Sequence, residues 1–224
     1  MAGKLYIVST PIGNYGDMTY RAVETLRSVD LIACEDTRKT GILLKHFGIE
    51  SKLFSYHDHN ENFKTAVLIE KLLTGEKIAV VSDAGTPCIS DPGFRIVRAA
   101  REKEIEIIGV PGATAFVNAL VISGMPTDSF VFEGFLPHKK GRQTKLKMIA
   151  EEKRTVILYE SVHRIIKLLE QLTELIPERN ICVLREMTKI YEEHSCGLPS
   201  DVLKVFNEKI PKGEFAVVIE GKRS

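Results

Sequence analysis

Residues 80–93 read Val-Val-Ser-Asp-Ala-Gly-Thr-Pro-Cys-Ile-Ser-Asp-Pro-Gly, and this stretch decides the fold class. It begins inside the apolar run 78–81, which predicts a buried strand because it is short and bounded by turn residues. In the polar part, Gly85 can adopt a positive φ and let a ligand approach the backbone, while Pro87 and Pro92 stiffen the loop. Open α/β sheets bind ligands at such loops, beyond the carboxyl ends of their strands. Turns of this composition also join strands to helices without binding anything, but two prolines and two aspartates exceed what a connector needs.

The order of strand, polar turn and helix recurs along the first half of the chain. Strands are expected at residues 4–9, 30–34, 52–56, 78–81 and 106–110. Such alternation predicts a five-stranded, mainly parallel sheet with right-handed crossovers and helices on both faces. The polar turns after these strands then lie along one edge of the sheet, where chemistry is expected.

A break in this pattern at Gly124-Met125-Pro126-Thr127 is interpreted as a linker between two domains, residues 1–124 and 125–224. In the second half, strands are expected at residues 129–133, 155–159, 180–185, 190–196 and 215–220. Some of these strands follow one another without a helix between them. The second domain is therefore expected to be a mixed-sheet α/β domain.

Composition places the chain among ordinary cytoplasmic proteins. It has 224 residues, 44% hydrophobic and 27% charged, with a formal net charge of +1. Its apolar runs are too short to span a bilayer, and its N-terminus lacks the apolar core of a signal peptide. Four scattered cysteines without a C-x-x-C pair predict reduced thiols rather than disulfides or a zinc site. They are Cys34, Cys88, Cys182 and Cys196.

Motif searches exclude several common sites. The chain has neither the glycine-rich dinucleotide fingerprint nor a P-loop. His57 and His59 have no third histidine or cysteine at a ligand spacing, so no metal site is expected. The turn Glu35-Asp36-Thr37-Arg38 has two interpretations that the residues alone leave open. It could orient substrate and handle a proton, or its acidic residues could simply stabilise a helix N-terminus.

The densest basic segment, residues 138–147, also has two interpretations. Its lysines and arginine could bind phosphates, or they could cover a solvated helix face. Considered alone, the second interpretation is favoured, because the near-neutral net charge does not indicate a nucleic-acid partner.

A set of motifs running in order along the whole chain carries a family resemblance. They occupy residues 10–14, 35–38, 81–87, 89–93, 110–113, 134–137, 160–164, 185–189 and 212–214. By these motifs the chain resembles the tetrapyrrole methylase superfamily of S-adenosylmethionine-dependent methyltransferases. Within that superfamily it is most similar to enzymes that methylate the ribose 2′-hydroxyl of a cytidine in 16S ribosomal RNA.

The resemblance implies a homodimeric two-domain enzyme with S-adenosylmethionine bound in a cleft between the domains. It implies cofactor contacts at Pro11, Asp83, Gly85, Thr86, Pro87, Thr114 and Ala115, and further ones at Tyr159, Met187 and Glu214. It also implies that the small ribosomal subunit is the partner. The basic segment then gains weight as an RNA contact, through Lys139, Lys140, Arg142 and Lys145.

Catalytic roles are hypotheses built on this resemblance. A ribose hydroxyl must be aligned with the methyl group and must lose its proton to a nearby acceptor. Glu35 and Arg38 are proposed for these tasks, together with Arg185 and Lys189. Three other functions compete: methylation of a tetrapyrrole or other small molecule, a non-catalytic ribosome-binding module, and a simple nucleotide-binding protein.

Overall fold

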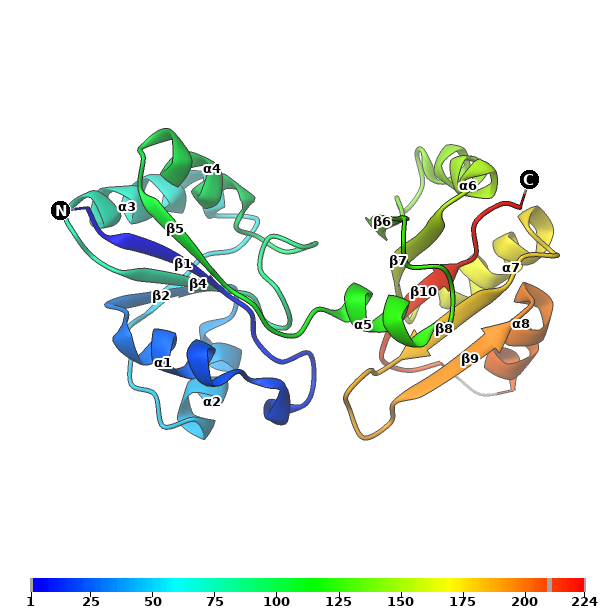
Figure 1. Cartoon of the computed structure of the whole chain (residues 1–224), viewed down its shortest axis with the longest axis horizontal. Helices are drawn as coiled ribbons and strands as arrows, with labels where there is room; N and C mark the ends of the chain where they lie inside the picture. Colours follow the sequence, from blue (N-terminus) through cyan, green and yellow to red (C-terminus); the bar gives the residue numbers. More distant parts are fainter. Residues whose placement is uncertain (1, 209–210, 224) are drawn as a thin grey trace. The chain divides into compact units, whose positions relative to one another are not determined.

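The computed structural model describes residues 2–208 and 211–223. Its contacts divide the chain into two compact units that meet at the Thr114–Ala115 bond (Figure 1). The sequence placed the linker ten residues later, around Gly124. The structure groups helix α5 (Ala115–Ile122) with the second unit because α5 packs against two strands of that unit's sheet.

The first unit is built on a five-stranded sheet of order β3-β2-β4-β1-β5, and every neighbouring pair is parallel. This confirms the predicted topology. The strands are β1 (Lys4–Val8), β2 (Leu31–Cys34), β3 (Leu53–Ser55), β4 (Ile78–Val81) and β5 (Glu106–Val110). Figure 1 shows α1 (Tyr20–Ser28) and α2 (Thr37–His46) on one face of this sheet, with α3 (Glu61–Leu73) and α4 (Phe94–Glu102) on the other.

Strand β4 lies at the centre of the sheet and explains why residues 78–81 read as a continuous apolar run. Ile78 and Val80 pack into the core under α3 and α4, while Ala79 and Val81 pack into the core under α1 and α2. All four are buried. Complete burial of an aliphatic side chain such as Val80 contributes about 1.5–3 kcal/mol to the stability of the fold. Strand β4 therefore binds the helical layers on both faces of the sheet. Its end also fixes the position at which the polar loop begins.

The second unit has a mixed sheet of order β6-β7-β10-β8-β9, as predicted. Its β6–β7 pair is parallel, and the β7–β10, β10–β8 and β8–β9 pairs are antiparallel. The strands are β6 (Phe130–Phe135), β7 (Thr155–Ser161), β8 (Ile181–Arg185), β9 (Glu193–Gly197) and β10 (Glu214–Ile219). Strand β9 begins later than the predicted 190–196 because Glu186 and Thr188 adopt positive φ values and start a tight loop.

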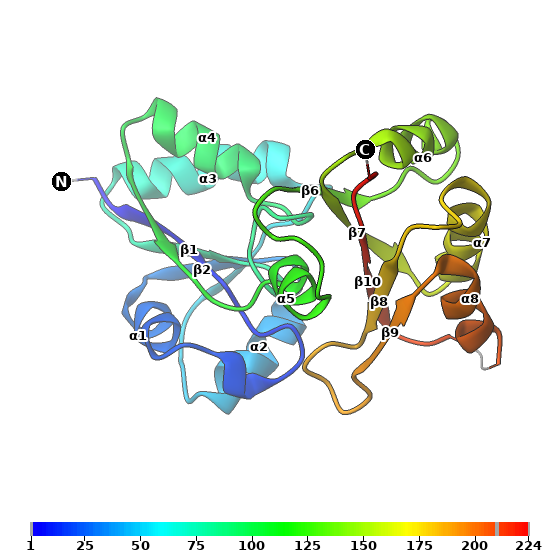
Figure 2. The ribbon, with the colours of Figure 1, turned by 45° about the vertical axis from the view of Figure 1, so that its right-hand side comes forward.

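The two faces of the second sheet are covered by different helices. Phe215, Val217 and Ile219 share a core with α6 (Arg142–Glu151), α7 (Ile165–Leu175) and α8 (Pro199–Asn207). Helix α5 contacts β10 and β7 but contributes nothing to that core, so it covers the opposite face. Figure 2 shows α7 and α8 side by side.

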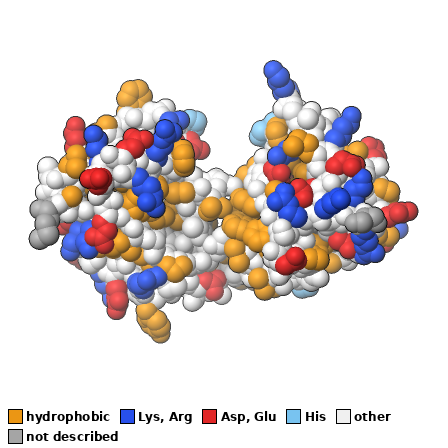
Figure 3. Space-filling model, turned by 45° about the horizontal axis from the view of Figure 1, so that its top comes forward, with side chains coloured by type: hydrophobic (Ala, Val, Ile, Leu, Met, Phe, Trp, Pro, Cys, Tyr) orange, Lys and Arg blue, Asp and Glu red, His pale blue; other side chains and the backbone are white. Residues whose placement is uncertain are grey.

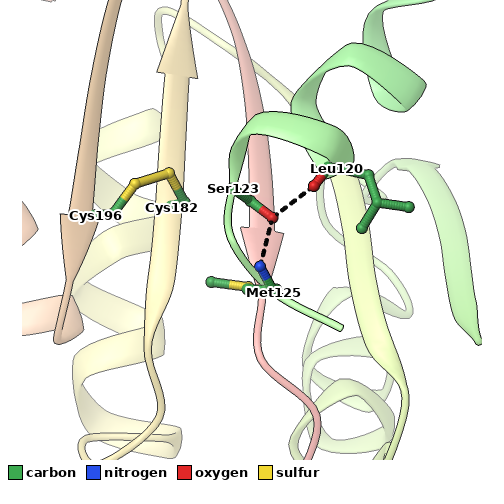
Figure 4. The surroundings of a disulfide bond; sticks show 5 residues. All are labelled: Leu120, Ser123, Met125, Cys182 and Cys196. Carbon is green, nitrogen blue, oxygen red and sulfur yellow. Dashed lines mark hydrogen bonds between the residues drawn. A yellow bond between two sulfur atoms is a disulfide. The ribbon is translucent and has the colours of Figure 1, made fainter. Parts of the chain in front are cut away.

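Strands β8 and β9 are joined by a disulfide between Cys182 and Cys196, which lie directly opposite each other in the antiparallel register. Figure 4 shows this bond beside the end of α5, where Ser123 Oγ donates to Leu120 O (2.8 Å) and accepts from Met125 N (3.2 Å). The disulfide links residues that are 14 positions apart in the chain.

The prediction of four reduced cysteines is therefore wrong for this pair, whereas Cys34 and Cys88 are free thiols. The spacing of Cys182 and Cys196 in the sequence gave no sign of pairing. What brings them together is the register of two strands, and the strand containing Cys196 was predicted with shifted bounds.

The surface of the protein carries both signs of charge. In the view of Figure 3, Lys and Arg side chains are interspersed with Asp and Glu side chains, in keeping with the net charge of +1. Among the described residues, no helix combines the length and apolar character needed to cross a membrane.

Candidate functional site

Two loops at the carboxyl edge of the first sheet are fastened to each other by backbone hydrogen bonds. Thr10, after β1, and Gly85, after β4, exchange hydrogen bonds in both directions, with N···O distances of 2.9 and 3.1 Å. The Thr10 hydroxyl also donates to Ser82 O (3.2 Å). Gly85 has a φ of +82°, and a Cβ there would lie 3.2 Å from Ile12 Cγ2. The bridge therefore fixes a tight, left-handed bend that disfavours any side chain.

A chain of hydroxyl groups extends this connection to a third loop. Thr86 Oγ1 lies 2.9 Å from Ser9 Oγ and 2.7 Å from Thr114 Oγ1, and it donates to Ala113 O at 3.2 Å. A Cβ on Gly112 would come within 2.9 Å of Ser9 Cβ, so the loops after β1 and β5 are in close contact. Three of the predicted cofactor residues, Gly85, Thr86 and Thr114, are thus brought together within the loops that follow β4 and β5.

Asp83 ties the loop after β4 to the loop after β2. Its carboxylate accepts hydrogen bonds from Asp36 N (3.1 Å) and from Lys39 Nζ (2.7 Å). Asp36 in turn accepts from Arg38 N, Nε and Nη2, which holds the pKa of the Asp36 carboxyl well below its usual range. Both charges of the Asp36–Arg38 pair are therefore satisfied locally, and Asp83 holds the loops in position.

The Glu35 carboxyl has no such compensation. Burial is the largest cause that raises its pKa to about 7, followed by repulsion from Asp91, Asp83 and Asp58, while Lys39 opposes the shift. Within the described part of the chain, Glu35 Oε1 is buried and has no hydrogen-bond partner. An acidic oxygen left free in this way suits a group that binds or removes a proton from a ligand.

Asp91 is one of the acidic residues around Glu35, and the sequence analysis gave it no role in the site. Burial is the largest cause that raises its pKa to about 6, and repulsion from Asp83 and Asp58 adds to the shift. Its loop is compact: Cys88 and Ser90 have positive φ values, and a Cβ on Gly93 would lie 2.6 Å from Cys88 Sγ. The signal was present as the second aspartate of residues 80–93, in a segment, 89–93, that was noted only as a motif.

The predicted residues of the second unit lie around α5 and the loop between β8 and β9. Tyr159 Oη accepts a hydrogen bond from Phe116 N (3.0 Å), and its ring packs against Phe132 with centroids 5.1 Å apart. Met187 is buried, with its sulfur 4.0 Å from Asn118 Nδ2. Tyr159 and Met187 therefore both contact α5.

Three further predicted residues belong to ion pairs of the second unit. Lys189 Nζ lies 2.9 Å from both Glu186 Oε1 and Glu214 Oε2. Arg185 Nη1 lies 2.9 Å from Glu193 Oε2. The lysine and the two glutamates form one cluster, and Arg185 pairs separately along the β8–β9 ladder.

The basic segment divides into buried and exposed members. Arg142 is only 5% exposed, and its guanidinium donates to Glu160 (3.2 Å) and Gln171 (3.0 Å). Lys145 pairs with Glu133 at 2.6 Å. Lys139 and Lys140 are exposed. Of the four predicted RNA contacts, these two lysines are the fully exposed ones, and Lys145 is partly exposed.

The histidines of residues 57–59 do not form a metal site. Their rings lie 5.9 Å apart, and His57 Nε2 is 2.9 Å from Asn60 Nδ2. Over the described residues, no group of three or more His, Cys, Asp or Glu side chains is placed to hold a metal ion.

A comparison with known protein families identifies the family of this chain. The family model described as Tetrapyrrole (Corrin/Porphyrin) Methylases matches residues 4–196. The chain belongs to the tetrapyrrole methylase family. Its resemblance to that family, drawn first from the loop motifs, is thereby confirmed.

Relatives of known name extend the match over almost the full length. A protein of Synechocystis sp. is 55% identical over 98% of this chain and 79% of its own length. One of Haemophilus influenzae is 50% identical over 99% of this chain and 80% of its length. One of Thermotoga maritima is 43% identical over 98% of this chain and 99% of its length. All three are named ribosomal RNA small subunit methyltransferase I.

Solved structures show that tetrapyrrole methylases share this fold. The uroporphyrin-III-C-methyltransferase of Thermus thermophilus superposes with a TM-score of 0.65 at 23% identity, covering 96% of this chain and 94% of its own. The cobalamin biosynthetic enzyme cobalt precorrin-4 methyltransferase gives a TM-score of 0.66 at 15% identity, with coverages of 97% and 94%. At these identities the likeness establishes the fold alone.

Proposed function

We propose that this protein methylates the ribose 2′-hydroxyl of a cytidine in 16S ribosomal RNA, with S-adenosylmethionine as the methyl donor. The observation that carries the proposal is the 55% identity, over 98% of the chain, to a protein named ribosomal RNA small subunit methyltransferase I. The loops at the carboxyl edge of the first sheet support it, because they combine a tight glycine bend with a buried acidic oxygen that has no hydrogen-bond partner.

The chemistry of these loops suits the proposed cofactor. The bend at Gly85 lets a ligand approach the backbone closely, and the hydroxyls of Thr86 and Thr114 hold that bend rigid. When bound, S-adenosylmethionine supplies a methyl group on a positively charged sulfur, and the Glu35 carboxylate lies in the same group of loops. We assign the cofactor contacts in this unit to Pro11, Asp83, Gly85, Thr86, Pro87 and Thr114. The assignments of Ala115, Tyr159, Met187 and Glu214 stay predictions from the family resemblance.

Glu35 is assigned the role of proton acceptor. Its raised pKa, about 7, matches the pH at which a general base is both largely ionised and basic enough to accept a proton. Arg38 is satisfied by Asp36, so we assign it to orienting the loop after β2 rather than to a direct chemical step. Arg185 and Lys189 remain proposed catalytic groups of the second unit.

RNA binding is assigned to the exposed lysines of the basic segment. Lys139 and Lys140 precede α6, and helix N-termini attract phosphate groups. Arg142 and Lys145 instead hold the segment to the body of its unit through Glu160 and Glu133. We propose a cytoplasmic location, since the ribosomal substrate is found there, and a homodimeric state, which the family resemblance implies.

Transfer of labelled methyl groups tests this function. The purified protein is incubated with tritiated S-adenosylmethionine and one of three acceptors: intact small ribosomal subunits, deproteinised 16S RNA, or uroporphyrinogen III. Label is expected in RNA, and the first two acceptors show whether the assembled subunit is required. Label in the tetrapyrrole alone would overturn the proposal in favour of a small-molecule acceptor, and no transfer to any acceptor would favour a non-catalytic module.

A further inference from the structure

Two large apolar side chains stand next to each other in water in the loop between β8 and β9. Ile190 is 94% exposed and Tyr191 is 72% exposed. Within the described part of the chain, the Tyr191 side chain takes part in no ring contact, hydrogen bond or ion pair. Single exposed apolar side chains are ordinary on a protein surface, whereas apolar side chains that adjoin one another in water are typical of binding surfaces. We call these two residues the exposed pair.

The backbone of the exposed pair is held in place by the loop itself. Arg185 and Glu193 close the loop, as opposite residues of the β8–β9 ladder whose side chains are paired at 2.9 Å. Inside it, Lys189 N donates to Glu186 O at 3.0 Å, and Glu192 N donates to Lys189 O at 3.1 Å. The exposed pair forms the middle of the second of these turns. Figure 2 shows the loop extending beyond the ends of the two strands.

The charged groups around the exposed pair are engaged within the loop. Lys189 Nζ lies 2.9 Å from both Glu186 Oε1 and Glu214 Oε2. Glu192 Oε2 accepts a hydrogen bond from Thr188 N at 2.8 Å. The lysine of this loop is therefore not free to bind a phosphate group. What the tip of the loop offers to a ligand is an aromatic ring with an aliphatic neighbour, which suits a flat, uncharged group.

We propose that the exposed pair is a stacking platform for an unpaired base of the RNA strand that carries the methylated cytidine. The inference rests on the proposed methylation of RNA. Proteins recognise single-stranded RNA by stacking its splayed bases on aromatic side chains. Because the turn already fixes the backbone of Tyr191, little of the binding energy is spent on ordering the loop. The platform grips a base, whereas the exposed lysines Lys139 and Lys140 are assigned to phosphates.

Steady-state methyl transfer to intact small ribosomal subunits tests the inference with matched variants. Tyr191→Ala should raise KM for the subunits at least about fivefold, as expected for the loss of a stacking aromatic ring. Its kcat and its affinity for S-adenosylmethionine should stay within about twofold, because the lost contact binds substrate and transition state alike. Tyr191→Trp should keep the KM of the parent, and Tyr191→Leu, apolar but not aromatic, should resemble Tyr191→Ala. The control Tyr20→Ala, which removes a 93% exposed tyrosine of α1, should match the parent.

Several outcomes would overturn the inference. An unchanged KM in Tyr191→Ala, or a loss confined to kcat, would exclude a base contact. Full activity in Tyr191→Leu would show that an apolar contact suffices without stacking. A parent that is dimeric by light scattering and a Tyr191→Ala variant that is monomeric would assign the exposed pair to a second copy of the chain. If the parent transfers no methyl group to RNA, the proposed function itself fails, which is a different result.

Fluorescence gives an independent measurement of stacking. The chain has no tryptophan, so Tyr191→Trp places a single indole at the tip of the loop. Its emission should be quenched when deproteinised 16S RNA binds, and the emission of a matched Tyr20→Trp variant should not. Unchanged emission of Tyr191→Trp while filter binding shows the RNA bound, or equal quenching in both variants, would contradict the platform. Stacking neutralises no phosphate, so Tyr191→Ala should weaken RNA binding and leave its salt slope unchanged.

Discussion

Thr10 and Gly85 face each other across an isolated antiparallel bridge, with Thr10 N 2.9 Å from Gly85 O and Gly85 N 3.1 Å from Thr10 O. Loops usually vary in position, yet here two loops that are far apart in the sequence are fastened backbone to backbone. Rigid loops on a rigid sheet position reacting groups with the accuracy that methyl transfer needs. The bend at Gly85 is therefore the first place to test the site.

Gly85→Ala should weaken binding of S-adenosylmethionine by at least about tenfold, because the added Cβ meets Ile12 at 3.2 Å and strains a left-handed bend. Isothermal titration calorimetry measures the effect. Gly48→Ala is the matched control: its φ is also positive, at +59°, but a Cβ there meets nothing within 4 Å. The control should lose about 1 kcal/mol of stability and keep its affinity. Equal losses of affinity in both variants would show that strain alone, and not the site, is responsible.

Glu35→Gln should raise the free energy of unfolding at pH 8 relative to the parent. The folded pKa of Glu35 lies near 7, above its ordinary value of 4.5, so its favourable contribution is complete below pH 4.5 and lost as pH rises through 7. The Gln side chain of the variant does not ionise, so it does not lose this stability, which is on the order of 1 kcal/mol for a partly buried group. Urea unfolding at pH 4 and pH 8 measures the difference, and an equal effect at both values would contradict the assigned shift.

Arg142→Met should destabilise the second unit by about 3 kcal/mol, since it removes one partner of a buried ion pair with Glu160.

The double variant Lys139→Ala/Lys140→Ala should unfold like the parent, because both side chains are exposed. It should instead weaken RNA binding and lower the salt slope of the binding constant by about 1 per lysine. Filter binding over a range of salt concentrations measures the slope, and an unchanged slope would remove these lysines from the RNA contact.

Reduction of the Cys182–Cys196 disulfide should lower stability by up to about 3 kcal/mol, the loop-closure contribution for a separation of 14 residues. Denaturant unfolding with and without a reductant measures this. Cys196→Ser should remove the dependence on reductant, whereas Cys88→Ser, which alters a free thiol, should retain it. If the stability of the parent protein is the same with and without a reductant, the contribution assigned to the disulfide is contradicted.

Local patterns were sufficient to predict the first sheet. The apolar run Ile78–Val81 was found with its observed bounds because a central parallel strand is buried on both faces. The polar turns after the strands then predicted which edge carries the site. In the second unit the mixed sheet was foreseen, but β9 was predicted with shifted bounds, since positive φ values at Glu186 and Thr188 leave little trace in non-glycine residues.

Long-range contacts are what the sequence could not provide. Arg142 read as one member of a basic segment, and its burial depends on Glu160 and Gln171, which lie on other elements. The raised pKa of Glu35 likewise depends on Asp91, Asp83 and Asp58, which lie in other loops. In both cases the surroundings of a charged residue are set by its neighbours in space and not by its neighbours in sequence.

Nucleoside mass spectrometry of methylated RNA tests the central claim most directly. Small ribosomal subunits lacking the modification are incubated with this protein and S-adenosylmethionine that carries a deuterated methyl group. We predict one deuterated 2′-O-methylcytidine per 16S RNA, and its near absence when Gly85→Ala replaces the parent protein. Deuterium on a base, or RNA that stays unlabelled while the donor is bound, would contradict the account.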